Sequence, residues 1–155
     1  MEADPHTDLP PGGSARILVC EDSRDERLAL AHFLRRRGYQ VDETGDGRAS
    51  IQHIKDHEIH AVLLDLMMPD GDGFEVLRYL QEHRRALPVI LISGMPPEQI
   101  QHKMHRLPKH ELPALLIKPI DMNQVLELLE LKLSGEIPEF ELPAGEEDEP
   151  IDRAG

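Results

Sequence analysis

Short apolar runs alternate with amphipathic segments through the middle of this 155-residue chain, and this alternation restricts the fold more than any other feature. Four of the runs hold four or five apolar residues between polar or turn residues, as buried strands do: 16–20 (RILVC), 61–65 (AVLLD), 88–93 (PVILIS) and 114–118 (ALLIK). A fifth, more polar run, 39–44 (YQVDET), alternates in polarity, which is typical of an edge strand.

Helical segments separate these strands. Ser23 with Glu26, and Asp121 with Gln124, have the spacing of capping boxes at the starts of two of them. Strand and helix therefore alternate five times, which predicts an α/β fold with a parallel sheet covered by helices on both faces. The segments with helical spacing of apolar residues are 23–38, 47–57, 73–83 and 121–133.

The charge is distributed unevenly along the chain. The net charge is -13, but residues 134–155 contain eight acids and one arginine, and residues 1–15 contain three acids and no base. Both terminal segments are rich in Pro, Gly and acids, so we expect a disordered N-terminal extension (1–15), one domain (16–133) and an acidic, Pro-rich disordered tail (134–155).

Composition also restricts the partners and the location. An acidic chain is unsuited to binding the nucleic-acid backbone, and the basic cluster Arg35–Arg37 suits the end of a helix, where it favours the helix dipole. No apolar run approaches the roughly 20 residues of a membrane span, and the first residues do not resemble a signal peptide. The single cysteine, Cys20, lies in an apolar run and is expected to be buried. We expect a cytoplasmic protein with no direct nucleic-acid binding and no membrane insertion.

Polar side chains follow the predicted buried strands at the point where each one ends. These are Glu21 and Asp22, then Asp65, Ser93 and Lys118. The carboxyl ends of parallel strands meet at one edge of the sheet, so we expect these side chains to converge in one cleft. Three acids so close repel one another unless a cation intervenes, and Mg²⁺ is the candidate. The competing interpretation is that each acid caps a neighbouring helix.

This set of groups suits one kind of chemistry. A carboxylate beside a metal ion can attack phosphorus and form an aspartyl phosphate. The charge that develops on the phosphoryl oxygens is stabilised by Mg²⁺, an ammonium group and a hydroxyl group. The sequence thus points to phosphoryl transfer onto a carboxylate.

Four motifs carry a resemblance to a known family: VCEDS, LLDLMMPDGDG, LISG and IKP, in this order. Together they resemble the response-regulator receiver domain of two-component signal transduction. The resemblance covers about 16–133 and implies a doubly wound, flavodoxin-like (βα)5 three-layer sandwich with strand order 2-1-3-4-5. It also implies a stand-alone phosphoacceptor switch rather than an enzyme, with at most Mg²⁺-dependent self-phosphorylation and autodephosphorylation.

The resemblance also assigns roles to the candidate metal site. Asp65 is the expected phosphoacceptor. Mg²⁺ (or Mn²⁺) is expected to bind Asp22 and Asp65 directly, Glu21 mainly through water, and the backbone carbonyl of Met67.

The resemblance further implies that Lys118 contacts the phosphoryl group and that Ser93 moves to meet it. Pro119, after the lysine, is often preceded by a cis bond in the family. The expected partners are a sensor histidine kinase or phosphotransfer protein and a downstream protein target, with a homodimer as a further option.

Two departures from the family pattern bear on signalling. Leu115 stands three residues before the lysine, where receivers commonly have Tyr or Phe. Pro108 and Pro113 predict a short or displaced fourth helix. A phosphorylation-independent, receiver-like interaction module is therefore the main alternative. A haloacid-dehalogenase-type phosphatase is disfavoured, because Met67 replaces the second Asp that this class requires two residues after the first.

Met67 and Met95 stand two residues beyond Asp65 and Ser93. In the family, side chains at these offsets influence how water reaches the phosphoaspartate, and two thioethers position an attacking water poorly. We therefore expect a phosphorylated state that lasts much longer than a few seconds. The competing interpretation is that both methionines only pack the rim of the cleft.

The remaining signals are weaker. His53 with His57, and His102 with His105, are spaced like two ligands on one helix face, but no Cys or acid completes a metal site. The DGDG stretch, 70–73, resembles a fragment of a calcium loop, and we interpret it as a turn into the next helix.

Overall fold

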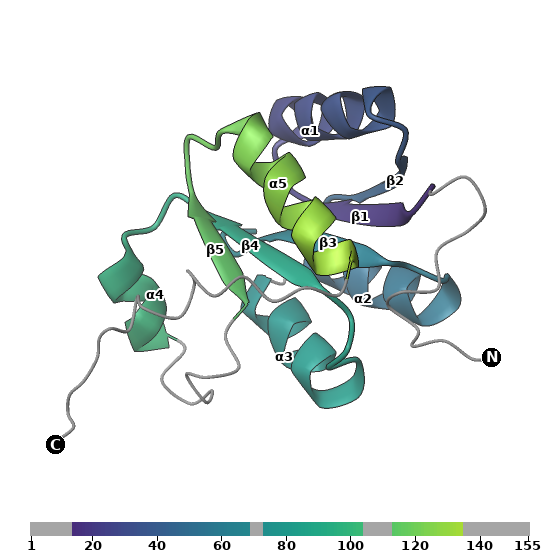
Figure 1. Cartoon of the computed structure of the whole chain (residues 1–155). Helices are drawn as coiled ribbons and strands as arrows, with labels where there is room; N and C mark the ends of the chain where they lie inside the picture. Colours follow the sequence, from purple (N-terminus) through teal and green to yellow (C-terminus); the bar gives the residue numbers. More distant parts are fainter. Residues whose placement is uncertain (1–13, 69–72, 104–112, 135–155) are drawn as a thin grey trace, which may run out of the picture.

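The computed structural model describes residues 14–68, 73–103 and 113–134. Strands and helices alternate throughout these residues (Figure 1). The strands are β1 (Arg16–Cys20), β2 (Gln40–Thr44), β3 (Ala61–Asp65), β4 (Val89–Ser93) and β5 (Ala114–Ile117). The helices are α1 (Arg24–Arg36), α2 (Gly47–Asp56), α3 (Gly73–His83), α4 (Pro97–Lys103) and α5 (Met122–Leu133).

The five strands form one parallel sheet in the order β2-β1-β3-β4-β5. Helices α1 and α5 cover one face, and α2, α3 and α4 cover the other (Figure 1). The predicted three-layer sandwich and its strand order are confirmed. In this topology every strand carries its chain toward the same edge of the sheet, so the residues that follow β1, β3, β4 and β5 are gathered there.

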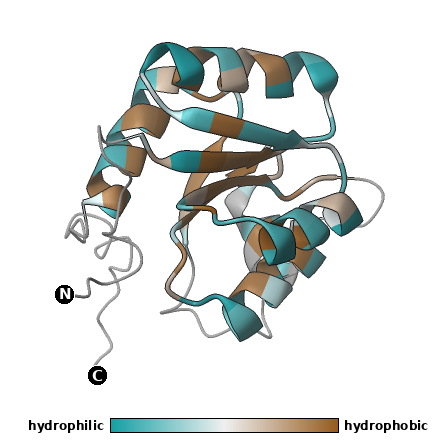
Figure 2. Ribbon diagram, turned by 90° about the vertical axis from the view of Figure 1, so that its right-hand side faces the viewer, coloured by the Kyte–Doolittle hydropathy of each residue, from teal (hydrophilic) through white to brown (hydrophobic). Residues whose placement is uncertain are grey.

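The core lies on both faces of the sheet. Every residue of β3 and β4 is buried, and the apolar strands occupy the centre of the molecule (Figure 2). Successive side chains of a strand point to opposite faces. Leu18 and Val62 thus pack beneath α2 and α3, whereas Ile17 and Leu63 pack beneath α1 and α5. Packing on two faces fixes the direction in which each strand ends.

The helix caps agree in part with the sequence. Ser23 caps α1, and its Oγ accepts a hydrogen bond from the Glu26 N–H at 3.4 Å. The other half of the predicted capping box is not formed, because the Ser23 N–H donates to Glu21 Oε2 at 3.0 Å. Asp121 caps α5, but its carboxylate accepts from the Asn123 N–H at 2.9 Å, one position earlier than a capping box requires. The Gln124 N–H instead donates to the Asp121 backbone carbonyl.

The basic cluster lies at the end of α1 and the cysteine is buried, as the sequence predicts. Arg35 reaches from α1 to β2, where its guanidinium donates to the Val41 carbonyl at 2.7 Å and lies 3.1 Å from a Glu43 carboxylate oxygen. The Arg37 guanidinium lies over an aromatic ring of the same helix. Cys20 is buried, and burial raises the pKa of its thiol to about 11.

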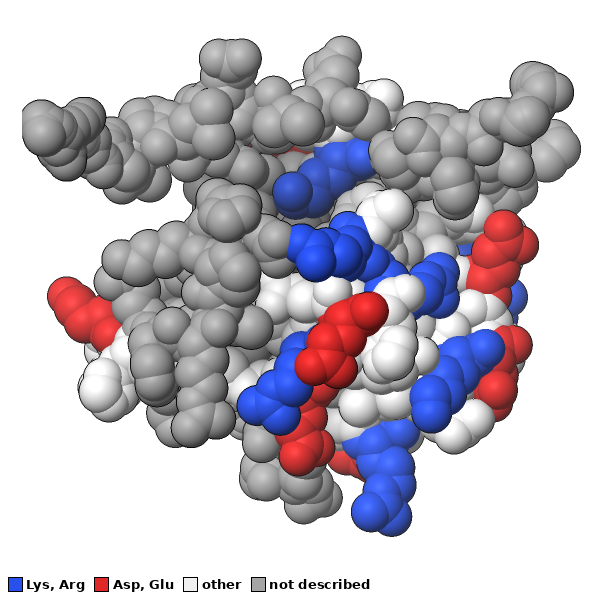
Figure 3. All heavy atoms as spheres, turned by 90° about the horizontal axis from the view of Figure 1, so that it is seen from below, with Lys and Arg blue, Asp and Glu red and all other residues white. Residues whose placement is uncertain are grey.

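Charged side chains of both signs share the described surface. On the face seen from below, Lys and Arg side chains lie among Asp and Glu side chains (Figure 3). This mixture agrees with the distribution of charge along the sequence, in which most of the net charge of -13 belongs to the terminal segments 1–15 and 134–155.

Helix α4 has seven described residues and ends where this described range ends, so the expected short or displaced fourth helix stays a prediction. Pro108 lies outside the described residues, and Pro113 directly precedes β5. The segments predicted to be disordered also lie outside them, apart from Ser14, Ala15 and Ser134. No helix in the described ranges is long and apolar enough to cross a membrane.

Gly73 offers a test of how tightly the end of β3 is packed. A Cβ atom at this first residue of α3 would overlap the Asp65 carbonyl oxygen and would lie 2.6 Å from the Leu66 Cα. Both are backbone atoms that cannot rotate away, so Gly73→Ala is expected to lower the free energy of unfolding by about 3 kcal/mol. Urea unfolding measures this change.

Gly94→Ala is the matched control. Its added Cβ would meet the Lys118 side chain at 3.9 Å, an ordinary contact distance. We expect a change within about 1 kcal/mol. Equal losses of stability in the two variants would contradict the described packing of α3 against β3.

Candidate functional site

Three carboxylates meet at the carboxyl edge of the sheet. Glu21 and Asp22 directly follow β1, and Asp65 is the last residue of β3. One carboxylate oxygen from each lies within 4.8 Å of the others. Glu21 is 2% exposed and Asp65 is 1% exposed, whereas Asp22 lies at the surface. The predicted convergence of the three acids is therefore found in the structure.

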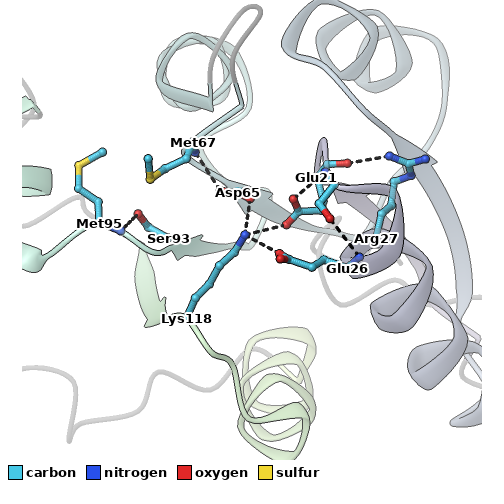
Figure 4. Close-up of polar contacts among 9 residues, drawn as sticks. Glu21, Glu26, Arg27, Asp65, Met67, Ser93, Met95 and Lys118 are labelled. Atoms are coloured by element: carbon cyan, nitrogen blue, oxygen red, sulfur yellow. Dashed lines mark hydrogen bonds and ion pairs between the residues drawn. The ribbon is translucent and has the colours of Figure 1, made fainter.

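Lys118 brings a positive charge into this cluster from the end of β5. Its Nζ donates to Asp65 Oδ2 at 2.8 Å, to Glu21 Oε1 at 3.3 Å and to Glu26 Oε1 at 2.6 Å (Figure 4). Buried carboxylates are costly without a partner, and this ammonium supplies one for both buried acids.

The Asp65 carboxylate is held at both oxygens. Oδ2 accepts from Lys118, and Oδ1 accepts from the Met67 backbone N–H at 2.8 Å (Figure 4). Two donors of fixed position orient the carboxylate at the tip of a fully buried strand. The group is thereby preorganised, and ordering it during a reaction costs little further entropy.

The pKa values reflect this crowding. The pKa of Glu21 is raised to about 8. Burial is the largest cause and the neighbouring Asp65 adds to it, whereas the Ser23 N–H and Lys118 act in the opposite direction. Burial lowers the pKa of Lys118, but its hydrogen bonds to Asp65 and Glu26 outweigh that effect and raise it overall. Negative charge is thus in excess at this edge, which is the condition in which a divalent cation binds.

Ser93, the last residue of β4, lies on the opposite side of Asp65 from Glu21 (Figure 4). It is fully buried, and its Oγ accepts a hydrogen bond from the Met95 N–H at 2.9 Å. Met95 is itself buried, whereas Met67 is 50% exposed. The two methionines therefore differ, because only Met67 presents its thioether to solvent.

Leu115 and Pro119 are the remaining predicted positions. Leu115 pairs with Leu91 across the sheet and is partly buried against the core cluster that contains Met95. The Lys118–Pro119 peptide bond is cis, the geometry that the resemblance implied.

Sequence reasoning missed two residues of the site. Glu26 was interpreted only as part of a cap, yet its side chain contacts Lys118. Arg27 donates from Nη1 to the Glu21 backbone carbonyl at 2.9 Å (Figure 4). Its Nε donates to Glu43 at 3.3 Å, and Arg27 so ties the loop after β1 to β2. Both stand in the first turn of α1, and the sequence carries no signal for the direction of their side chains.

The histidine pairs form no metal centre among the described residues, where the one group of three or more potential ligands is the acidic cluster. His53 Nε2 lies 2.7 Å from Asp42 Oδ2, and its ring stacks on that of His57. An acid therefore does adjoin this pair, but it pairs with His53 and with Arg16.

The second histidine pair and the DGDG stretch are only partly within the described residues. His102 is exposed, and His105 lies outside the described residues. Of the DGDG stretch only Gly73 is described, and it begins α3.

Comparison with known proteins identifies the family. Residues 17–130 match the model of the response regulator receiver domain. The chain belongs to this family. Receiver domains are phosphoacceptor switches that interact with histidine kinases and downstream targets, and they bind Mg²⁺ at an acidic pocket.

Curated relatives include response regulator RR06 of Streptococcus pneumoniae, 37% identical over 91 residues, which are 59% of this chain and 42% of RR06. The transcriptional regulatory protein PdtaR of Mycobacterium tuberculosis is 28% identical over 131 residues, 84% of this chain and 62% of PdtaR. The chain thus spans less than two thirds of the length of these relatives.

Solved receiver structures share the fold. A CheY-like receiver protein from Methanospirillum hungatei has a TM-score of 0.71 at 21% identity and covers 79% of this chain and 95% of its own. The response regulator TrrA from Thermotoga maritima, in complex with Mg²⁺ and BeF, has a TM-score of 0.66 at 22% identity over 76% of this chain and 98% of its own.

The raised pKa of Glu21 predicts how stability depends on pH in the absence of metal. Its ordinary value is 4.5 and its folded value about 8, so the folded protein binds this proton more tightly than the unfolded chain. The stabilisation is fully present below pH 4.5 and is lost as the pH rises through about 8. In EDTA we expect the free energy of unfolding of the wild type to fall over this range relative to that of Glu21→Gln.

Urea unfolding at a series of pH values measures the difference, and saturating Mg²⁺ should reduce it because the metal favours the ionised carboxylate. Parallel pH profiles for the wild type and Glu21→Gln in EDTA would contradict this assignment.

Proposed function

We propose that this protein is a phosphoacceptor of a two-component phosphorelay and that Asp65 receives the phosphoryl group. The observation that carries this proposal is the arrangement of Asp65, which is held by Lys118 and the Met67 N–H beside two further acids. A structural cap would satisfy an acid with backbone N–H groups alone, whereas Asp65 also pairs with an ammonium group in an acid-rich pocket.

The transfer step follows from this arrangement. A carboxylate oxygen of Asp65 forms a bond to phosphorus while the bond from phosphorus to the donor histidine nitrogen breaks. The electron pair of that bond stays with the imidazole nitrogen, which takes up a proton. Lys118 then stabilises the negative charge on the phosphoryl oxygens.

The acidic cluster fits Mg²⁺ or Mn²⁺, since it offers hard oxygen ligands from three residues within mutual reach. We assign Asp22 and Asp65 as direct ligands, with the Met67 carbonyl, and Glu21 as a ligand through water. When bound, the metal supplies positive charge to the phosphoryl oxygens. Arg27 holds the loop that carries Glu21 and thereby helps to position it.

The response to phosphorylation is assigned to Ser93 and Leu115. Ser93 Oγ accepts from the Met95 N–H, and its hydroxyl proton can be donated to a phosphoryl oxygen on Asp65 once the side chain moves toward it. In place of the aromatic ring usual in the family, Leu115 packs on the same core cluster as Met95. A leucine fills less volume than an aromatic ring, so the accompanying change at β5 is expected to be small.

The proposed partners are a sensor histidine kinase or phosphotransfer protein as donor and a protein target as receiver of the signal. In this proposal the chain is cytoplasmic and is a switch rather than an enzyme. It signals by protein–protein contact, and phosphorylation-dependent dimerisation is one form of that signal. A phosphorylation-independent interaction module is the alternative, and Leu115 is the feature that favours it.

Phosphorylation of Asp65 is directly testable by mass. After incubation with Mg²⁺ and acetyl phosphate, the intact mass of the wild type should rise by one phosphoryl group. Hydroxylamine should remove it, since an acyl phosphate is cleaved by this nucleophile. Asp65→Asn, which keeps the shape of the side chain but lacks a nucleophilic carboxylate, should gain nothing.

A gain of mass in Asp65→Asn equal to that of the wild type would contradict the assignment of Asp65. No gain in folded wild type, with acetyl phosphate or with histidine kinases as donors, would favour the phosphorylation-independent module.

The exposed thioether of Met67 predicts a long-lived phosphorylated state. Met67→Asn places an amide where it can hydrogen-bond an attacking water, so we expect dephosphorylation at least about threefold faster than in the wild type. Met67→Leu introduces no hydrogen-bonding group, so it should leave the rate of dephosphorylation unchanged. The loss of the phosphoryl mass over time measures the dephosphorylation rate of each variant. Loss of the phosphoryl group from the wild type within seconds would contradict the expected long-lived state.

A further inference from the structure

Glu26 is a fourth acidic side chain at the proposed site, and neither the metal nor the acceptor role requires it. Its Oε1 lies 2.6 Å from Lys118 Nζ, the shortest contact that this ammonium group makes with an acid among the described residues. Glu26 reaches Lys118 from the first turn of α1 (Figure 4). It is not part of the cluster of three carboxylates that could hold a cation.

The contacts of Lys118 use all of its hydrogen-bonding capacity. A lysine ammonium group has three N–H donors and no acceptor. Asp65, Glu21 and Glu26 each accept from Nζ, so no N–H remains for a phosphoryl oxygen. Lys118 can contact a phosphoryl group only after it has released one of these acids.

Glu26 is the acid that is cheapest to release. Its side chain is 54% exposed, whereas those of Glu21 and Asp65 are 3% and 2% exposed. Water can solvate the Glu26 carboxylate as soon as it leaves Lys118, but it cannot reach the two buried carboxylates. Until that release, the Glu26 charge also opposes the approach of an anionic donor.

We propose that Glu26 is a positioning residue that competes with the incoming phosphoryl group for Lys118 and thereby slows phosphoryl acceptance. This inference rests on the proposed role of Asp65 as acceptor. With acetyl phosphate, an Asp65 oxygen bonds to phosphorus, the bond from phosphorus to the acetyl oxygen breaks, and its electron pair leaves with acetate. Glu26 neither gains nor loses a proton in this step.

The test compares Glu26→Gln with Asp25→Asn. The first change keeps the size of the side chain and the backbone N–H that Ser23 caps, but it removes the charge. At saturating Mg²⁺, we expect the rate of phosphorylation by acetyl phosphate to rise about three- to tenfold in Glu26→Gln. Asp25→Asn removes the same charge from the same exposed turn, and its rate should stay within about twofold of the wild type.

A second readout needs neither metal nor phosphate. In EDTA, the rate at which an acylating reagent modifies Lys118 is measured by peptide mass against Lys55 and Lys132 of the same molecule. Loss of the ion pair should make Lys118 several times more reactive in Glu26→Gln, because a neutral amide holds its Nζ less strongly than the carboxylate at 2.6 Å does. Asp25→Asn should leave this ratio unchanged.

The outcomes separate the two proposals. Phosphorylation of the wild type and Glu26→Gln at equal rates would overturn the role of Glu26 and leave Asp65 as the acceptor. An increase of the same size in Asp25→Asn would also overturn it, since general charge would then explain the effect. No phosphorylation of either folded protein, with acetyl phosphate or with histidine kinases as donors, would overturn the acceptor role, and the role of Glu26 with it.

Discussion

The ion pair between Lys118 and the two buried acids, Asp65 and Glu21, is the interaction on which the site depends. Both carboxylates are almost fully buried, and Lys118 is the cation that contacts them among the described residues. Burial of an unpaired charge costs several kcal/mol, on the order of 3–5 when one partner of a buried pair is removed. The charges of the site are thus closely balanced, and in the proposed function a phosphoryl group and a divalent cation change that balance.

The parallel sheet brings these charged side chains together. Because β1, β3 and β5 are parallel, the residues that follow them arrive at the same edge, although Glu21 and Lys118 are far apart in the sequence. The fully buried strand β3 and the close approach of Gly73 to Asp65 leave Asp65 little freedom to move. The sensitivity of the site to added charge therefore comes from its side chains and not from a deformable backbone.

Much of the fold and of the candidate site could be predicted from the sequence for a physical reason. Apolar runs of strand length with an acid or a lysine at their ends specify both the sheet and its reactive edge, so the sequence alone points to Asp65 and Lys118. The contacts of Glu26 and Arg27 could not be predicted, because a helical side chain that is not fully buried has several directions open to it. The acid beside His53 was missed for a related reason, since Asp42 lies on a neighbouring strand rather than on the same helix.

The central claim is that Lys118 neutralises buried acids at a site built for a cation and a phosphoryl group. The most direct test is the free energy of unfolding of Lys118→Met at pH about 8, in EDTA and in Mg²⁺. Removal of the ammonium group should cost about 3 kcal/mol in EDTA, and Mg²⁺ should restore most of that loss by supplying the missing positive charge. A variant as stable as the wild type in EDTA, or one that Mg²⁺ does not stabilise, would contradict the account.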